Sequence, residues 1–135
     1  MGELWMPGGL QVRVLVDGEA TGGAFCLIED EPPAGWSLPP HSHVRESETI
    51  YVVDGQFSVE VGTEEILSGP GDVIHIPAGV THSARTLGDE PGRRLITFAP
   101  AGIEAFFREV GEREPATEHD LVAVAASAAR HGWQF

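Results

Sequence analysis

The amino-acid sequence predicts an all-β domain of the sandwich or barrel type, followed by a short helical extension. Its 135 residues are the length of one domain. Up to about residue 100, short apolar segments are bounded by Gly and Pro, which is typical of strands. Beyond that point the apolar residues recur with the period of a helix. We therefore expect residues 1–100 to form a β-barrel domain and residues 101–135 to form a helical extension of it.

The first expected strand covers residues 10–16, where apolar side chains alternate, and Asp17-Gly18 after it suits a hairpin turn. Residues 24–29 are apolar on both faces, as expected of a strand inside a sandwich. The remaining strands are expected at residues 49–54, 57–61, 64–67, 73–76, 82–87 and 93–99. Short strands at such regular spacing indicate a barrel or sandwich.

Two helices are expected after residue 102. The first has an apolar stripe at positions i, i+3, i+4 and i+7, formed by Ile103, Phe106, Phe107 and Val110. The second would begin after Thr117 as N-cap and end before Gly132. The chain then ends with Trp133-Gln134-Phe135, and two terminal aromatic side chains are expected to pack on the barrel or on a partner subunit.

The charge pattern excludes several functions. Eight basic residues against 21 acidic ones give a net charge of −13, which would repel the phosphates of nucleic acids and anionic membranes. All basic residues are Arg, so no Lys is present for Schiff-base chemistry. The single cysteine, Cys26, cannot form an internal disulfide and is expected to be a small buried apolar residue. The N-terminus lacks the features of a signal peptide, so we expect a soluble cytoplasmic protein.

Histidine residues provide the clearest chemical signal. His41 and His43 are two residues apart, so in an extended chain both imidazoles point to the same face. Together with Glu48 and His82 from other segments they would form a site suited to a divalent transition metal. The spacing from His43 to Glu48 is odd, which requires a bend or bulge between them. Alone, the His-x-His pair would favour two surface histidines in a Pro-rich turn over metal ligands.

Nine residues at fixed spacing carry a family resemblance. Gly35, His41, His43, Glu48 and Gly55 match the first cupin motif, and Gly71, Pro77, Gly79 and His82 match the second. The second motif departs at its end, where Thr86 stands in place of the family's Asn. The chain thus resembles the cupins, and in particular small bacterial single-domain cupins related to quercetin-type dioxygenases. This resemblance implies a double-stranded β-helix, or jelly-roll barrel, with His41, His43, Glu48 and His82 as metal ligands.

The ligand types suit Fe, Mn, Ni, Co, Cu or Zn, and the resemblance favours Fe(II). It also implies a metal-dependent dioxygenase acting on a small enolic or aromatic substrate. Two alternatives stay open, namely a non-catalytic small-molecule binding or sensing protein and a metal-dependent isomerase or lyase. The cupin resemblance and the terminal segments favour a homodimer, with a monomer as the alternative. No separate catalytic residue is predicted.

Residues around the expected ligands are candidates for a pocket wall. Ile50 and Val52 lie two and four residues after Glu48, so in a strand they point to the same face as Glu48, whereas Tyr51 should face the opposite way. Ala84 and Thr86 share the parity of His82, and His75 would be a pocket acid or base if it points inward. Plain core packing is the alternative for all of them, and for His75 a hydrogen-bonded barrel histidine. Glu46 is expected to be a solvated loop acid, with a partner role behind the ligands as the alternative.

Overall fold

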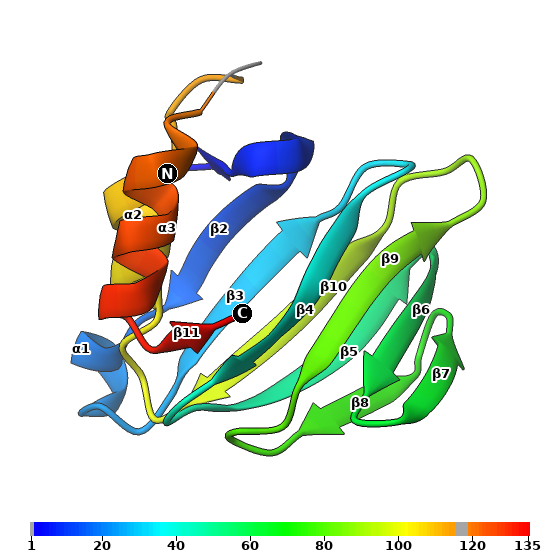
Figure 1. Cartoon of the computed structure of the whole chain (residues 1–135), viewed down its shortest axis with the longest axis horizontal. Coiled ribbons are helices and arrows are strands. Elements are labelled where there is room, and N and C mark those ends of the chain that lie inside the picture. Colours follow the sequence, from blue (N-terminus) through cyan, green and yellow to red (C-terminus); the bar gives the residue numbers. More distant parts are fainter. Residues whose placement is uncertain (1, 116–118) are drawn as a thin grey trace.

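The computed structural model describes residues 2–115 and 119–135, and it consists of two antiparallel sheets with helices at one end (Figure 1). The six-stranded sheet has the order β1 (Leu4–Trp5), β2 (Gln11–Val16), β3 (Cys26–Glu31), β10 (Arg93–Ala99), β5 (Ser47–Asp54) and β8 (Val73–Ile76). The five-stranded sheet has the order β11 (Trp133–Gln134), β4 (Ser37–His43), β9 (His82–Leu87), β6 (Gln56–Val61) and β7 (Glu64–Ser68). The predicted all-β fold with a small helical extension is confirmed.

The hydrophobic core lies between the two sheets. Inward-facing residues alternate along each strand, so Ile50 and Val52 are buried while Tyr51 between them is 45% exposed, as their parity predicted. The two sheets contribute Val12, Ile28, Ile50, Val52, Ile96 and Phe98 from one side and Phe57 and Val59 from the other. Burial of these side chains is the main stabilising contribution to such a fold.

The helices cover the end of the six-stranded sheet that carries β1 and β2 (Figure 1). Helix α2 spans Glu104–Val110 and helix α3 spans Leu121–Arg130. Phe106 and Phe107 of α2 and Ala128 of α3 join the core cluster, so the predicted apolar stripe of the first helix faces the barrel. Among the described residues, no helix has the length and apolar character needed to cross a membrane.

Three local features differ from the sequence-based expectations. Asp17 does not start a hairpin but caps the short helix α1 (Gly18–Thr21), accepting a hydrogen bond from the Ala20 amide at 3.2 Å. Strand β4 was missed because it contains two prolines, which are tolerated where the ladder leaves the backbone unpaired. Thr117 lies outside the described residues, and Asp120 is the residue that caps α3.

Gly55 shows why one motif glycine is required. It connects β5 to β6 with a φ of +90°, which disfavours any residue with a side chain. A Cβ at this position would also lie 2.6 Å from the Cα of Gly92. The turn therefore needs Gly both for its backbone conformation and for its close packing against the strand connection before β10.

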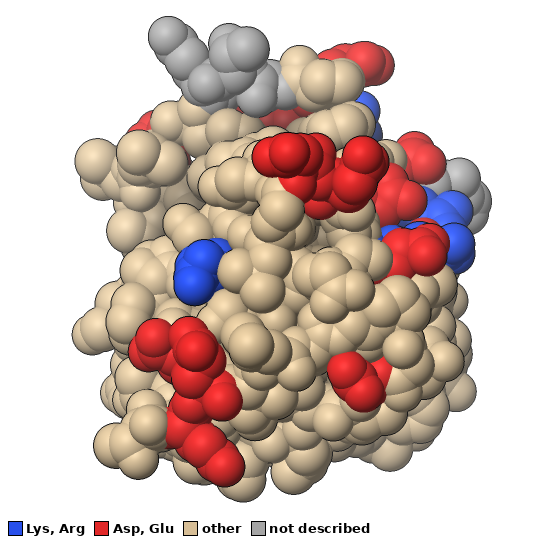
Figure 2. Space-filling view, turned by 90° about the vertical axis from the view of Figure 1, so that its right-hand side faces the viewer, with Lys and Arg blue, Asp and Glu red and all other residues tan. Residues whose placement is uncertain are grey.

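Charged side chains are distributed unevenly. On the face shown in Figure 2, the described acidic residues form several separate groups and the Arg residues form no continuous patch. The outer face of the six-stranded sheet holds one organised network, in which Arg13 and Arg93 donate to opposite oxygens of Glu29 at 3.0 and 2.7 Å. Burial alone would raise the pKa of Glu29, but the hydrogen bonds from Arg93 and Arg13 outweigh it and lower that pKa.

This network predicts a pH-dependent contribution to stability. Because the pKa of Glu29 is lower in the folded state, its contribution is present above the unfolded-state value of about 4.3 and is lost as the pH falls through the folded value. Urea unfolding between pH 7 and pH 3 should therefore show Glu29→Gln destabilised at neutral pH, with the difference from wild type shrinking in acid. The exposed neighbour Glu31→Gln is the matched control. A destabilisation by Glu29→Gln that is constant over this pH range would contradict the assignment.

Candidate metal centre

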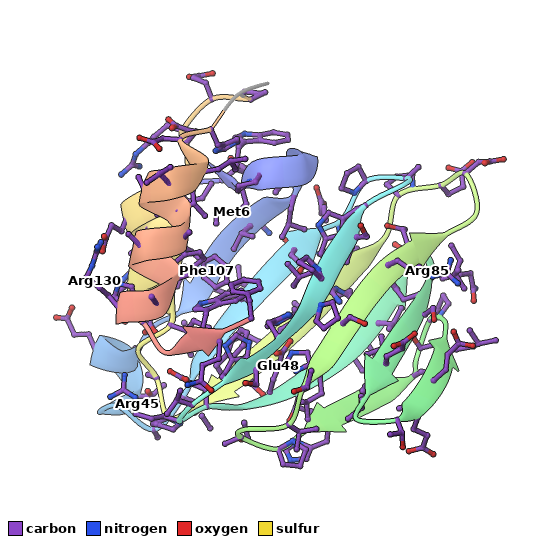
Figure 3. The ribbon with its side chains drawn as sticks, viewed as in Figure 1. Met6, Arg45, Glu48, Arg85, Phe107 and Arg130 are labelled. Carbon is purple, nitrogen blue, oxygen red and sulfur yellow. The ribbon has the colours of Figure 1, made fainter. Side chains whose placement is uncertain are left out.

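Three buried histidines and one buried glutamate converge between the sheets. His41 and His43 lie at the end of β4, and His82 begins β9, where it pairs directly with His41 across the ladder. Glu48 comes from β5 in the opposite sheet, so residues 44–46 carry the chain from one sheet to the other. This crossing is where the odd spacing between His43 and Glu48 is accommodated. Glu48 lies in the interior between the two sheets (Figure 3).

Nitrogens of the three imidazoles lie within reach of a single ion, and the Glu48 carboxylate lies beside two of the rings. One nitrogen from each of His41, His43 and His82 lies within 4.8 Å of the others. Glu48 Oε1 lies 3.5 Å from His43 Nε2 and 3.2 Å from His82 Nε2. All four residues are less than 10% exposed. The structure therefore brings together all four residues that the sequence singled out as ligands.

Backbone carbonyls set the orientation of two of the rings. The Pro39 carbonyl lies 2.8 Å from His41 Nδ1, and the Val80 carbonyl lies 3.0 Å from His82 Nδ1. A carbonyl can only accept, so Nδ1 must carry the proton when the ring is neutral. The lone pair is then on Nε2, the nitrogen available to a metal. In both cases the carbonyl belongs to the residue two positions earlier, so the local backbone, in strand β4 for His41 and in the turn before β9 for His82, fixes the tautomer.

Protonation equilibria at the site follow from burial and mutual proximity. Burial lowers the pKa of His41 to about 4, so this ring is neutral at pH 7. Burial alone would raise the pKa of Glu48, but the adjacent imidazoles of His43 and His82 outweigh it and lower that pKa, which keeps the carboxylate ionised. For His82 burial acts to lower the pKa, and the neighbouring Glu48 raises it above its usual value. A neutral imidazole beside an ionised carboxylate is the state that ligands require.

Unpaired atoms support a metal at this position. Among the described residues, Glu48 Oε1, His82 Nε2 and His43 Nδ1 are buried without a hydrogen-bond partner. Glu48 and His82 are close enough for a hydrogen bond, but the contact lacks the required alignment. Buried polar atoms normally have partners, so unpaired ones need an explanation. A divalent transition metal held by three imidazole nitrogens and one carboxylate oxygen fits the donor set.

A cavity of about 510 Å³ adjoins these residues, with His41, His43 and Glu48 on its wall. Most of its lining is apolar and comes from both sheets, from α2 and α3, and from the C-terminal segment. Phe107, buried on α2, projects toward this interior (Figure 3). The main apolar lining residues are Met6, Leu10, Val12, Ile28, Trp36, Leu38, Ile96, Phe98, Phe106, Phe107, Val124, Ala128, Trp133 and Phe135. Such a cavity has the size and character of a small-molecule site.

A buried ion pair also lies on the cavity wall. Arg94 on β10 donates to Asp30 on β3 through Nε at 2.9 Å and Nη2 at 2.6 Å, and both side chains are almost completely buried. The guanidinium also lies 5.1 Å from the ring centres of Trp36 and Phe57. The bidentate contact neutralises both charges, so this part of the wall is polar without being charged overall.

The sequence assigned a pocket role to Ile50, Val52, His75, Ala84 and Thr86, and the structure places none of them on the lining of the large cavity. Ile50 and Val52 are buried in the core, and Ala84 packs against that core. His75 is exposed, and its Nδ1 lies 2.9 Å from Thr49 Oγ1. Parity correctly separated inward from outward positions on β5, but it could not show which inward positions border empty space.

Thr86 has a structural contact instead. Its hydroxyl donates to the Pro33 carbonyl at 2.8 Å, and its amide donates to the Trp36 carbonyl at 2.9 Å. Thr86 therefore ties strand β9 to the loop that precedes β4. The cupin motif has Asn at this position. In this chain the Thr86 hydroxyl takes its place and holds the loop that leads into β4, the strand with His41 and His43.

Two further expectations have clear outcomes. Glu46 was expected to be a solvated loop acid, which is wrong, because it is only 2% exposed and its Oε1 has no hydrogen-bond partner within the described residues. Its place in the crossing between the sheets buries it, and no sequence pattern signals that. Cys26 is completely buried, as expected, and burial together with nearby Glu104 raises the pKa of its thiol to about 12.

Sequence reasoning missed much of the cavity wall. Asp30 and Arg94 lie two positions from the inward-facing Ile28 and Ile96 on their strands, so they point to the same face, which could have indicated a buried ion pair. Trp133 was expected to pack on the barrel or on a partner, and it packs on the barrel beside His41 and His43. That it lines the cavity depends on where the helices place it, which no local pattern encodes.

The two-sheet barrel with an internal His and Glu cluster is the architecture of a double-stranded β-helix. The chain matches the model of the cupin domain over residues 27–98, more than half of its length, and it belongs to the cupin family. The nine matched motif positions and the fold agree with this membership.

Several relatives are similar in sequence or structure. Quercetin 2,3-dioxygenase from Bacillus subtilis (strain 168) is 32% identical over 100 residues, covering 74% of this chain and 29% of that protein. Polyketide synthase CurC from Streptomyces cyaneus is 28% identical over 104 residues, covering 77% and 66%. The chain thus spans less than two thirds of the length of either relative.

Among solved structures, KdgF from Halomonas sp. superposes with a TM-score of 0.66 at 25% identity, covering 74% of this chain and 87% of that one. The polyketide cyclase RemF from Streptomyces resistomycificus superposes with a TM-score of 0.59 at 29% identity, covering 67% and 64%. The relatives include a dioxygenase and a polyketide cyclase, so the fold alone does not specify the reaction of this chain.

Proposed function

We propose that this chain is a metal-dependent oxidoreductase of the dioxygenase type, acting on a small enolic or aromatic substrate. His41, His43, Glu48 and His82 would hold the metal, with Fe(II) favoured and Mn, Ni, Co, Cu or Zn also compatible. The observation that carries the proposal is that these four buried side chains lie together and that three of them, His41, His43 and Glu48, line a largely apolar cavity of about 510 Å³. A substrate in that cavity would lie directly beside the proposed ligands.

The chain's own residues would contribute orientation, charge balance and exclusion of water. The carbonyls of Pro39 and Val80 hold the His41 and His82 rings with Nε2 available. The ionised Glu48 offsets part of the positive charge that a divalent ion brings into the barrel. The bound ion would supply Lewis acidity and open positions for the substrate oxygen and for dioxygen. The apolar walls would orient the substrate and keep water away from the reacting atoms.

The similarity to quercetin 2,3-dioxygenase supports the oxidoreductase class. That relative is named for the dioxygenation of quercetin, and the cavity wall of this chain, rich in Phe and Trp, suits an aromatic molecule. The expected homodimer and the cytoplasmic location stay predictions.

A second candidate is a metal-dependent reaction without oxygen, such as an isomerisation, elimination or ring closure. The specific observation in its favour is the similarity to the polyketide cyclase RemF at 29% identity. Both candidates use the same ligands and the same cavity, and they differ in whether dioxygen is consumed.

The ligand assignment predicts that the double variant His41→Ala, His43→Ala will not retain a metal. Two of the four ligands would be absent, and the remaining pair, Glu48 and His82, would bind a divalent ion only weakly. Elemental analysis after reloading and desalting should find about one equivalent of a transition metal in the wild type and none in the variant. His75→Ala, which removes an exposed imidazole, is the control and should retain the metal. Unchanged metal content in the double variant would disprove these ligands.

The reaction class predicts oxygen consumption. Metal-loaded protein should consume oxygen together with loss of substrate when offered a panel of flavonols, catechols and 1,3-diketones, and the double variant should not. An oxygen electrode combined with chromatography of the substrate measures both. Substrate conversion that proceeds equally without oxygen would favour the second candidate over the dioxygenase.

A further inference from the structure

The outer face of the six-stranded sheet is left to solvent in a single chain. The five-stranded sheet packs on its other face, and the helices gather at the end that carries β1 and β2 (Figure 1). Every second side chain of β2, β3, β10, β5 and β8 therefore points away from the core. Three of these outward side chains are large and apolar, and Leu15, Tyr51 and Val73 are 43%, 45% and 60% exposed.

The register of the strands brings apolar side chains of this face together. Leu95 on β10 lies opposite Tyr51 on β5, and Tyr51 lies opposite Val73 on β8. Leu27 on β3 points to the same side as Leu95 and is likewise partly exposed. We call Leu27, Leu95, Tyr51 and Val73 the outer patch. A continuous apolar patch across several strands is typical of an interaction surface.

The charges around the outer patch nearly cancel. The outward-facing charged side chains of β2, β3 and β10 are Arg13, Glu29, Glu31 and Arg93, and Asp54 lies opposite Arg93 at the end of β5. Arg13 and Arg93 both donate to Glu29. Two positive and three negative groups sum to −1, whereas the whole chain carries −13. This face is therefore almost neutral on a strongly acidic molecule.

This charge distribution indicates which partner fits the face. Two copies of a chain with charge −13 repel each other wherever their acidic groups meet, and the repulsion is smallest where the outer patch meets itself. A two-fold arrangement places the same patch on both sides of the contact. Arg13 and Arg93, whose side chains are 41% and 45% exposed, would then lie on the rim, where the partner copy brings acidic groups. An apolar centre with a polar rim is the usual organisation of an interface.

We propose that the outer face of the six-stranded sheet, centred on Tyr51 and Leu95, is the surface through which two copies of this chain form a two-fold dimer. The inference goes beyond the proposed function, because this face lies on the opposite side of the sheet from Glu48 and the cavity. It also differs from the terminal segments, which favoured a dimer in the sequence.

Sedimentation velocity of the full chain over the micromolar concentration range tests this surface. We expect the wild type to sediment with about twice the chain mass of 14.4 kDa. Tyr51→Glu places two like charges at the centre of the contact and should raise the dimer dissociation constant at least about tenfold. Since Tyr51 is half-exposed in the single chain, the variant should keep its fold, which circular dichroism checks.

Two control variants add the same negative charge elsewhere. Leu67→Glu changes a side chain that is 67% exposed on β7 of the other sheet, and Val122→Glu changes one that is 82% exposed on α3. Both should dimerise as the wild type does, because neither residue lies on the outer patch. Val122→Glu also tests the helical extension as the competing contact surface.

Salt dependence provides a measurement on the wild type alone, which does not require any variant to fold. Salt screens the repulsion between two copies of charge −13, so raising NaCl to about 0.3 M should tighten the dimer several-fold. A contact held by exposed ion pairs would instead become weaker.

Three results would overturn the inference: a wild type that stays monomeric over this concentration range, a Tyr51→Glu protein that dimerises as tightly as the wild type, or a dimer that salt weakens. Dissociation by Val122→Glu while Tyr51→Glu remains dimeric would place the contact on the helical extension instead. The metal site is tested separately, because Tyr51 faces the opposite side of β5 from Glu48.

Discussion

A buried carboxylate among three buried imidazoles is the constraint on which the rest of this structure depends. An ionised Glu48 in an apolar barrel is costly unless positive charge or hydrogen bonds compensate it. The histidines supply part of that compensation, and a bound cation would supply the remainder. The site therefore fits a barrel that binds a metal better than one that only packs its core.

The β-framework makes this arrangement rigid. His41 and His82 face one another across paired strands, while Glu48 approaches from the opposite sheet. Carbonyls two residues before each of these two histidines orient the rings, so the backbone of β4 and of the turn before β9 also selects the tautomer. The wall of the cavity is shared between these barrel strands and the helices with the C-terminal strand, which lie outside the segment that matches the family model.

The order and faces of most strands could be predicted because period-2 alternation and Gly-bounded turns are local signals. The four proposed ligands could be singled out because their spacing is fixed by a motif. Burial of Glu46, strand formation at Ser37–His43 despite two prolines, and capping by Asp17 could not be predicted. The first two depend on contacts between segments distant in the sequence, whereas the Asp17 cap is a local contact that was missed because Asp-Gly also favours a hairpin turn. The cavity wall depends on distant contacts as well, since Trp133 reaches His41 only through the packing of α2 and α3.

The central claim is that three imidazole nitrogens and one carboxylate oxygen bind the metal. X-ray absorption spectroscopy of the metal-loaded protein tests it most directly, because imidazole rings give characteristic outer-shell scattering. The account predicts a nitrogen and oxygen shell at about 2.0–2.2 Å with the contribution of three imidazoles. A shell without imidazole scattering, or one containing the sulfur of Cys26, would contradict it.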